Sequence, residues 1–398
     1  MKKMTAFLVL FLILLPFPAC QRSINDVQLM TVDIDPKSQP KGSLMLSDLV
    51  ERVEYIPLET NDNCIVGNIY NLFDVSENYI AVSDFMFQRQ VFLFDRAGRF
   101  ITKIGSRGQG PGEYVMQREV FIDESKKCIY VKDLRKLLMY DFSGKHLNSF
   151  SFDEDFAEIY PGSDNQFITA RFSNQSNEDY DVYVLWDSTM NLVKRAVKGV
   201  PIIIRSQIGA SYASIGSISS CYIYQGFSHL KENVLNDTVY LVNKNNEFIP
   251  KYIINFGRYT TTPEDKGDVD NYWENRISGK FIAGVSVFEA SNFLFPRYNY
   301  RDKWIPCYFD KKTNQLLYFD SEEGIPDDYT GGIVFWPSKQ KNNELYIFYN
   351  SYDLLKKIDQ QNKLTPKGPA ESVRKVQSLL ENLDPEDNPV LIIATLKE

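Results

Sequence analysis

The chain has 398 residues and a formal net charge of −8, and 14% of its residues are aromatic. An acidic chain lacks the basic footprint of nucleic-acid-binding proteins, so no nucleic-acid partner is expected. It contains only two histidines, His146 and His229. This leaves little room for a histidine-based metal site or catalytic triad, and no metal or other cofactor is expected.

The first residues predict a secretory signal. A start with two lysines precedes an unbroken apolar stretch over residues 5–17, and a small residue, Ala19, stands before Cys20. A charged start, a short apolar core and a small residue before the cut are typical of export signals. The stretch is shorter than the roughly 20 apolar residues that a transmembrane helix needs. We expect residues 1–19 to be a signal peptide that is cleaved before Cys20.

The position of Cys20, directly after this signal, resembles a bacterial lipobox and predicts lipidation. Phe17 and Pro18 depart from the usual lead-in of that motif, and the alternative is a plain signal peptide with an incidental cysteine. A lipidated cysteine would anchor the mature protein to a membrane of the bacterial envelope. Residues 20–42 are polar and aperiodic, which predicts a flexible tether.

Beyond the tether the chain shows a repeated hairpin pattern. An apolar strand ends in Asp or Asn, a tight turn follows, and a second strand begins. Asp bonds to neighbouring backbone in such turns, and Gly accepts the positive φ that they require. The turn residues recur at intervals of roughly 45–65 residues, close to the length of a propeller blade. They are Asp95, Asp141, Asp187, Asn243, Asp310 and Asp359.

Six copies of one hairpin predict an all-β domain over residues 43–398, a six-bladed β-propeller with four-stranded blades. A β-sandwich also has short strands, but radial repetition explains the periodic turn chemistry better. The strand over residues 54–58 is expected to close the ring as the outer strand of blade six, and the tail over 388–394 is a second candidate. The stretch 370–383 has one apolar stripe and predicts a helix docked on the ring. We expect the ring to be a monomer.

Four cysteines besides Cys20 are far apart and form no CxxC pair: Cys64, Cys128, Cys221 and Cys307. An oxidising compartment permits disulfides, but nothing in the spacing pairs these four residues. Buried free thiols are therefore expected.

Three segments carry a family resemblance: Leu46–Thr60, Gly108–Tyr114 and Asn388–Leu391. They resemble six-bladed β-propeller lipoproteins of Gram-negative gut bacteria, which are themselves similar to NHL-repeat propellers. The resemblance covers residues 43–396 and is most specific in the first third. It implies a six-bladed fold and a location in the envelope, on the periplasmic or surface side of the outer membrane. It implies no activity and no catalytic residue.

One face of the predicted ring carries the candidate binding residues. Two links between blades are long, over 197–211 and 257–273, and loops of that length are often functional. Aromatic rings with nearby polar groups suit a sugar or a peptide, although such rings more often pack between blades. The aromatic residues expected on this face are Tyr114, Tyr272, Trp273, Tyr298, Tyr300, Trp304, Tyr349 and Tyr352.

The loop Gly108–Tyr114 is the sharpest local feature, and charged residues flank it. As a site, Glu113 could bind a hydroxyl group or a cation, with Arg107 and Arg118 beside it. As structure, the loop turns blade one into blade two while Glu113 pairs with an arginine, and Gly and Pro are first of all turn residues. No strand–loop–helix unit surrounds the glycines, which excludes a nucleotide-binding loop.

Three hypotheses of function follow. The first is a non-catalytic propeller that binds a glycan or a peptide through one face. The second is a carbohydrate-active hydrolase or lyase with carboxylate, Tyr and Arg residues at the central mouth. The third is a protein–protein scaffold. A deep central pocket with two desolvated carboxylates, or a Tyr–Arg–Glu cluster, favours catalysis, whereas a shallow aromatic face without perturbed acids favours binding.

Overall fold

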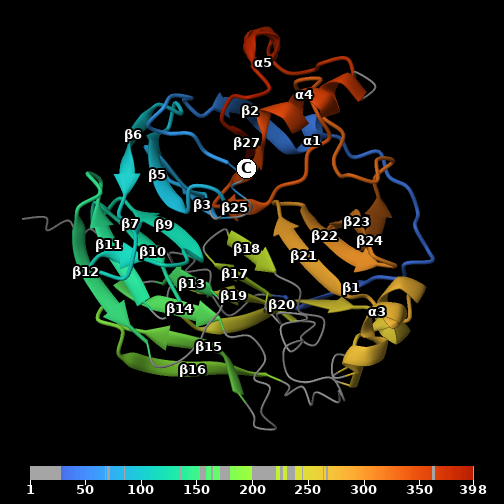
Figure 1. Ribbon diagram of the computed structural model, residues 1–398. Helices are drawn as coiled ribbons and strands as arrows, with labels where there is room; N and C mark the ends of the chain where they lie inside the picture. The colour runs from blue at the N-terminus through green and yellow to red at the C-terminus, as the bar shows by residue number, and fades with distance from the viewer. Residues whose placement is uncertain are drawn as a thin grey trace, which may run out of the picture.

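The computed structural model forms a six-bladed ring (Figure 1). It describes residues 28–397 except 68, 70–71, 85, 135, 153–157, 163–164, 171–179, 200–220, 225–226, 231–237, 244, 263, 266–267 and 361–363. Five sheets have four strands and one has five, so the expectation of an all-β propeller with four-stranded blades is confirmed. The signal peptide, Cys20 and most of the long link over 197–211 lie outside the described residues.

Blades one to three follow one another along the chain, each with its first strand innermost. Blade one comprises β3 (Phe73–Val75), β4 (Tyr79–Asp84), β5 (Gln90–Asp95) and β6 (Phe100–Ile104). Blade two comprises β9 (Glu119–Asp123), β10 (Cys128–Lys132), β11 (Lys136–Asp141) and β12 (His146–Ser151). Blade three comprises β13 (Glu158–Pro161), β14 (Phe167–Ala170), β15 (Tyr180–Trp186) and β16 (Leu192–Gly199). A small ribbon of β7 (Ser106–Arg107) and β8 (Glu113–Tyr114) stands between blades one and two.

Blades four to six complete the ring; blade four includes a strand from the N-terminal part of the chain, and blade six includes strands from both ends. Blade four comprises β17 (Cys221–Tyr224), β18 (Phe227–Leu230), β19 (Thr238–Val242), β20 (Phe248–Asn255) and β1 (Met30–Asp33). Blade five comprises β21 (Gly284–Glu289), β22 (Phe293–Tyr300), β23 (Lys303–Asp310) and β24 (Gln315–Tyr318). Blade six comprises β25 (Lys339–Lys341), β26 (Glu344–Tyr349), β27 (Val390–Leu396) and β2 (Val50–Pro57).

The repeated hairpins form as the turn chemistry predicts. In blade one, the Asp95 carboxylate accepts hydrogen bonds from the amides of Ala97 and Arg99 at 2.9 and 3.0 Å. Gly98 takes a φ of +83°, which a residue with a Cβ adopts only with strain. The same side-chain-to-amide bonding recurs at the four following turns, at Asp141, Asp187, Asn243 and Asp310.

The prediction of a sixth hairpin at Asp359 is wrong. Residues 351–360 form the helix α4 (Ser351–Gln360). Its apolar residues Leu354, Leu355 and Ile358 follow the helical spacing i, i+1, i+4, so one face can pack against blade six. The outer two strands of that blade come instead from the two chain ends: β2 pairs with β27 in antiparallel register from Val50 to Pro57. The expected closure by the N-terminal strand is confirmed, and the C-terminal tail lies directly inside it.

Residues 30–33 fall within the predicted tether, yet they form β1 and pair with β20 in parallel register. The segment continues past the outer strand of blade five, where Lys41 bridges to Tyr318, and enters blade six through α1 (Leu46–Leu49). We call residues 30–49 the N-terminal strap. Ordered structure therefore begins before residue 43, and the strap holds blades four, five and six from outside.

The core lies between the blades. Within the described residues, buried apolar clusters join each pair of neighbouring blades around the ring. Cys64, Cys128 and Cys307 are buried free thiols, as expected. The side chain of Cys221 is not among those described.

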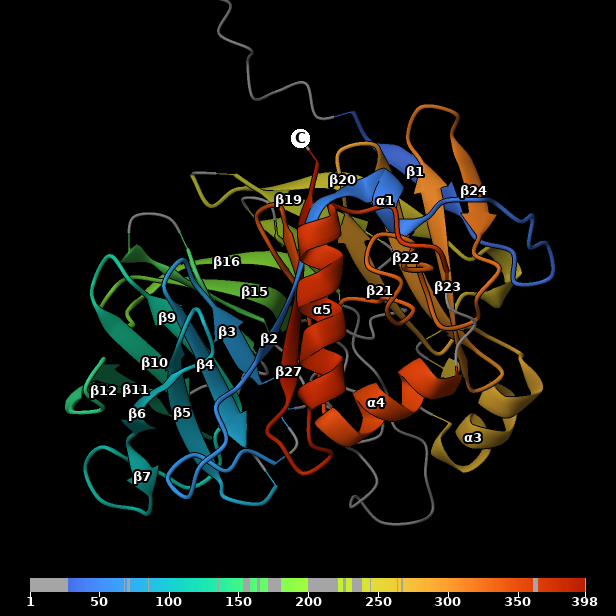
Figure 2. The ribbon, with the colours of Figure 1, turned by 90° about the horizontal axis from the view of Figure 1, so that it is seen from above.

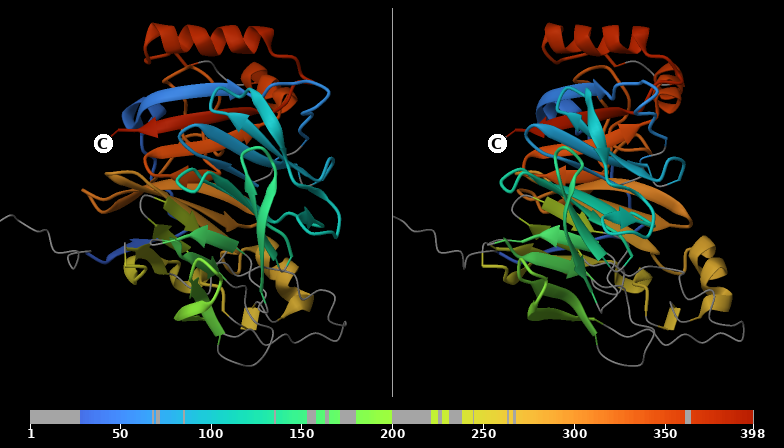
Figure 3. Two further views of the ribbon diagram at one scale, coloured as in Figure 1. Left: turned by 90° about the vertical axis from the view of Figure 1, so that its left-hand side faces the viewer. Right: turned by 60° about the vertical axis from the view of Figure 1, so that its left-hand side comes forward.

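The Asp/Asn turns define a hairpin face, and the opposite helix face carries α3 (Val269–Ser278), α4 and the β7–β8 ribbon (Figure 2). The predicted C-terminal helix is present as α5 (Ala370–Asn382), and it packs along β2 at the outer edge of blade six (Figure 3). A short 3₁₀ turn, η3 (Gly257–Tyr259), precedes α3. None of the described helices is long and apolar enough to cross a bilayer.

Candidate functional site

The loop Gly108–Tyr114 is held together by its own side chains. The Glu113 carboxylate accepts a hydrogen bond from the Gly110 amide at 2.8 Å. A Cβ at Gly108 would stand 1.9 Å from a Glu113 oxygen, so a larger residue there would displace this carboxylate. Glu113 thus closes its own loop and forms no ion pair with an arginine among the described residues, and Arg107 and Arg118 are exposed.

Tyr114 connects blades one and two and is completely buried. Its hydroxyl donates to the Ile104 carbonyl at 2.9 Å and accepts from the Val91 amide at 3.0 Å. Burial raises the pKa of this phenol well above its usual range. With its hydroxyl bonded on both sides and no exposed surface, Tyr114 is a packing residue.

The aromatic residues expected on the helix face differ in how far their side chains are buried. Tyr272, Tyr298 and Tyr300 are 3%, 0% and 8% exposed, so their side chains pack inside the ring and present little surface. Tyr298 shares a 3.1 Å hydrogen bond with the Tyr318 hydroxyl in the core between blades four and five. Trp273 is 46% exposed.

Trp273 belongs to a surface group on α3. This helix begins at the N-cap Asp268 and ends at Gly279, whose φ is +78°. The Arg276 guanidinium carbon lies 4.9 Å from the centre of the Trp273 indole, and its Nη2 lies 2.7 Å from Asp302. Arg276 is thereby neutralised and stacked, so it presents little free charge to a ligand.

A different group of polar residues lies on β22, facing blade six. Residues alternate between the two faces of a strand, and Leu294 and Tyr298 pack toward blade four whereas Phe295 packs toward blade six. Arg297 and Asn299 share the face of Phe295. This face is otherwise part of the apolar core between blades five and six.

Neither polar side chain is fully satisfied. Asn299 is 2% exposed, and its amide oxygen and nitrogen have no hydrogen-bond partner within the described part of the chain. The Nε of Arg297 is likewise buried and unbonded. Buried polar groups in native proteins are nearly always paired, so three open atoms on one strand face require an explanation.

Aromatic residues enclose the Arg297 guanidinium. Its central carbon lies 5.9 Å from the centre of the Trp304 indole and 5.7 Å from that of Trp336. Trp304 is directly opposite Asn299 in the sheet, and Tyr349 comes from β26 of blade six. Trp336 is buried, whereas Arg297, Trp304 and Tyr349 keep partial exposure. We call Arg297, Asn299, Trp304, Trp336 and Tyr349 the Arg297 cluster.

The electrostatics of this cluster reflect burial. Desolvation lowers the pKa of the Arg297 guanidinium, because the charged form loses water and gains little compensating charge. Burial, followed by the charge of Glu323, raises the pKa of Tyr349 to about 12. The Glu323 carboxylate itself forms an ion pair with Lys357, at a nitrogen–oxygen distance of 2.6 Å. The cluster therefore combines a cation without a close carboxylate and a phenol that stays protonated at neutral pH.

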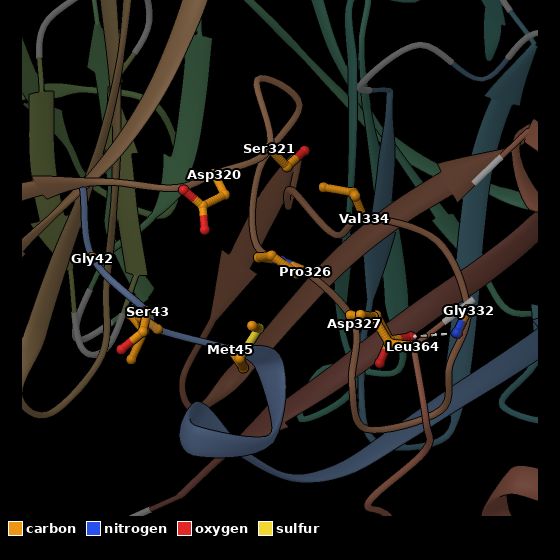
Figure 4. Close-up of a pocket in the computed structure, with 11 residues that line it drawn as sticks. Gly42, Ser43, Met45, Asp320, Ser321, Pro326, Asp327, Gly332, Val334 and Leu364 are labelled. Carbon is orange, nitrogen blue, oxygen red and sulfur yellow. Dashed lines mark hydrogen bonds between the residues drawn. The ribbon is translucent and has the colours of Figure 1, made fainter. Parts of the chain in front are cut away.

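A cavity of about 390 Å³ lies between the N-terminal strap and the link from blade five to blade six (Figure 4). Asp327 borders it, but its carboxylate accepts hydrogen bonds from the amides of Tyr329 and Thr330 at 2.9 and 2.8 Å. Burial raises the pKa of Asp327 in spite of these bonds. The carboxylate is used to shape its own turn, and the cavity walls around it are mostly small or apolar.

A second cavity, of about 300 Å³, lies on the hairpin-face side between blades five and six. Glu289 and Lys311 border it, and Glu289 also binds Lys251 at 2.9 Å. Both lysines therefore share the one Glu289 carboxylate. Among the described residues, no group of three or more His, Cys, Asp or Glu side chains is arranged to hold a metal ion.

Sequence reasoning reached Trp304 and Tyr349 but missed Arg297 and Asn299. The signal was present in the segment Phe293–Tyr300, where two polar residues at i and i+2 interrupt a run of aromatic and apolar residues. In a strand this spacing places both on one buried face. In the link before α3, the Asp265 carboxylate is bonded to Thr262 and to Lys280.

Comparisons with known proteins support the fold. The family model described as a domain of unknown function, DUF4934, matches residues 29–395. A crystal structure of a protein from Bacteroides fragilis whose name describes it as exported is 18% identical and has a TM-score of 0.66, with 93% of this chain and 100% of that chain covered. A member of the DUF4221 family from Bacteroides vulgatus is 10% identical with a TM-score of 0.49, covering 90% and 99%. No curated protein matches the chain.

Proposed function

This chain belongs to the DUF4934 family, and we propose that it is an exported, envelope-anchored propeller that binds a glycan or a peptide without converting it. The observation that carries this proposal is the Arg297 cluster, where a buried amide and a guanidinium have open hydrogen-bonding atoms beside partly exposed aromatic rings. Binding sites combine apolar walls with a few convergent polar groups, which matches this arrangement.

The location rests on the amino-terminal pattern. The apolar stretch over residues 5–17 and the position of Cys20 support export and lipidation. Labelling with palmitate tests the anchor: the chain should incorporate the label, and a Cys20→Ala variant should lose it. Incorporation that survives this substitution contradicts an anchor at Cys20. The likeness to NHL-repeat propellers stays a prediction.

A second candidate function, a carbohydrate hydrolase or lyase, is favoured by one observation. Tyr349, Arg297 and Glu323 influence one another electrostatically and so form a Tyr–Arg–Glu group. Two features weigh against catalysis. A phenol whose pKa is about 12 stays protonated near neutral pH and so is not available as a base, and the Glu323 carboxylate is already paired with Lys357.

One experiment distinguishes binding from turnover. The mature chain is applied to an array of glycans and peptides, and the compounds that bind are incubated with it and analysed by mass spectrometry. We expect retention of a subset of ligands at unchanged mass. A change in mass that disappears in a Tyr349→Phe variant would establish the enzyme instead, and failure to bind across both libraries would leave the scaffold hypothesis.

A further inference from the structure

The Arg297 cluster has a charge that the protein itself does not neutralise. Within the described residues, no carboxylate lies within ion-pair distance of Arg297, and the nearest acidic influence, Glu323, is bonded to Lys357. Other buried or half-buried cations of this ring, such as Lys311 and Arg96, have carboxylate partners. A desolvated guanidinium that lacks a carboxylate partner favours the binding of an anionic ligand.

The shape of the open groups selects among anions. A guanidinium offers a planar fork of donors that matches the two oxygens of a carboxylate. Arg297 and Asn299 are two residues apart on one strand, so their backbones are separated by roughly 6.7 Å. A carboxylate on the guanidinium therefore leaves the rest of a ring-sized ligand near the Asn299 amide, which offers both a donor and an acceptor.

The aromatic wall favours a sugar as the body of this ligand. Trp304 lies opposite Asn299 and is partly exposed, so its indole edge or face is available next to the open amide. A pyranose has an apolar face that packs on an indole and hydroxyl groups that donate and accept at its rim. An amide such as Asn299 can satisfy both kinds of hydroxyl contact at once.

We infer that the Arg297 cluster is a binding site for a sugar acid, with the guanidinium of Arg297 on the carboxylate and the amide of Asn299 on ring hydroxyls. This inference rests on the proposed binding function and narrows it to one ligand class. It also explains why two polar side chains occupy a strand face that otherwise belongs to the apolar core.

The test is a calorimetric titration of the mature chain with three probes. These are an oligosaccharide of glucuronic acid, the matching oligosaccharide of glucose, and a short peptide with a free C-terminal carboxylate. We expect the acidic oligosaccharide to bind at least 10-fold more tightly than the neutral one. Equal binding of the two sugars overturns this inference but leaves the proposed function intact. Binding of the peptide alone overturns the inference that the ligand is a sugar. Binding of none of the three probes contradicts the sugar-acid assignment, and the array of glycans and peptides then tests the proposed function separately.

Variants separate recognition from folding. Arg297→Gln should abolish the preference for the acid, and Arg297→Lys, which keeps the charge but loses the fork, should weaken binding. Asn299→Leu should weaken binding while the melting temperature is unchanged or raised, because it removes an unpaired buried amide. A purely structural Asn299 would instead lower the melting temperature and leave binding intact, which overturns the assignment. Arg99→Gln is the matched control, since Arg99 is exposed and bonded to Asp95 on the hairpin face.

Discussion

Glu289 joins blades four and five through a compact group of charges. It binds Lys251 at 2.9 Å, the Tyr252 hydroxyl at 2.5 Å and Lys311. Burial pushes the pKa of the Glu289 carboxyl upward, but the charges of Lys251 and Lys311 outweigh it, so the pKa lies below the ordinary value. Desolvation also lowers the pKa of Lys311. The Glu289 carboxylate therefore offsets part of the desolvation of the Lys311 ammonium.

Replacing Glu289 by Gln should lower the free energy of unfolding by about 3 kcal/mol at pH 7, because one partner of a buried ion group is removed. A carboxyl whose pKa is lowered by folding stabilises the native state above its unfolded pKa, and this contribution is lost as the pH falls through the folded value. The stability of Glu289→Gln should therefore depend less on pH on the acid side. Urea unfolding between pH 3 and 7 measures both effects.

The control for this prediction is Glu371→Gln, because Glu371 and Lys375 form a fully exposed pair on α5. Its unfolding curves should coincide with those of the unmodified chain at every pH. Equal effects of the two substitutions would contradict the role assigned to Glu289.

At the level of residues, the sequence could indicate chemistry but not burial. The glycines of Gly108–Tyr114 predicted a constrained turn, and the structure contains one. Whether Tyr114 faced solvent or the core depended on where blade two packs, which no local pattern encodes. Arg297 was overlooked for a related reason: its i, i+2 spacing with Asn299 marks one strand face, but only the packed neighbours Trp304 and Trp336 show that the guanidinium is enclosed.

Among the elements, the N-terminal strap is expected to contribute measurably to the free energy of unfolding. Val32 and Ile34 of this segment are 0% and 3% exposed and belong to the cluster between blades four and five. Val32→Ala should lower the free energy of unfolding by about 2 kcal/mol, as other truncations of buried aliphatic side chains do. Differential scanning calorimetry of the purified chain measures this loss.

The neighbouring residue supplies the control. Thr31 lies on the same strand with its side chain exposed, so Thr31→Ala should leave the melting temperature nearly unchanged. If both substitutions have small effects, the strap contributes little to stability and β1 is an accessory strand.

The hairpins could be predicted from sequence because their cause is local. In blades one to four an Asp or Asn at the strand end bonds to amides two and four residues later, and Asp310 in blade five bonds to amides two and three residues later. The copy at Asp359 failed because its apolar residues fit both a strand and an amphipathic helix, and packing against blade six selects the helix α4. The link over 257–273 was expected to be a long loop, yet α3 begins within it at Val269, after the N-cap Asp268, and ends before Gly279.

For the whole molecule, closure of the ring depends on Asn388. Its side-chain oxygen accepts from the Val66 amide at 2.7 Å, and its nitrogen donates to the carbonyls of Glu59 and Cys64. The Asn388 carbonyl accepts from Ser351 at 2.8 Å. Asn388 is 2% exposed. It therefore connects the start of β27 to the loop that follows β2.

Asn388→Ala should lower the free energy of unfolding by at least about 3 kcal/mol, because three backbone groups, two of them buried, lose their partners. Limited proteolysis should then cut first between residues 58 and 72 or near the C-terminus, which together close the ring. Asn382→Ala is a matched control on an exposed helix end, and it should leave the proteolytic pattern unchanged. A variant that resists protease as the parent chain does would show that strand pairing alone closes the ring.

The path of the strap has a consequence for orientation at a membrane. Because β1 runs parallel to β20, which starts at the Asn243 hairpin, Met30 enters the ring from the hairpin face. Ten residue steps separate Met30 from Cys20 and reach at most about 35 Å. A lipid on Cys20 would keep the hairpin face toward the leaflet, while the helix face would point outward, open to molecules arriving from the surrounding medium.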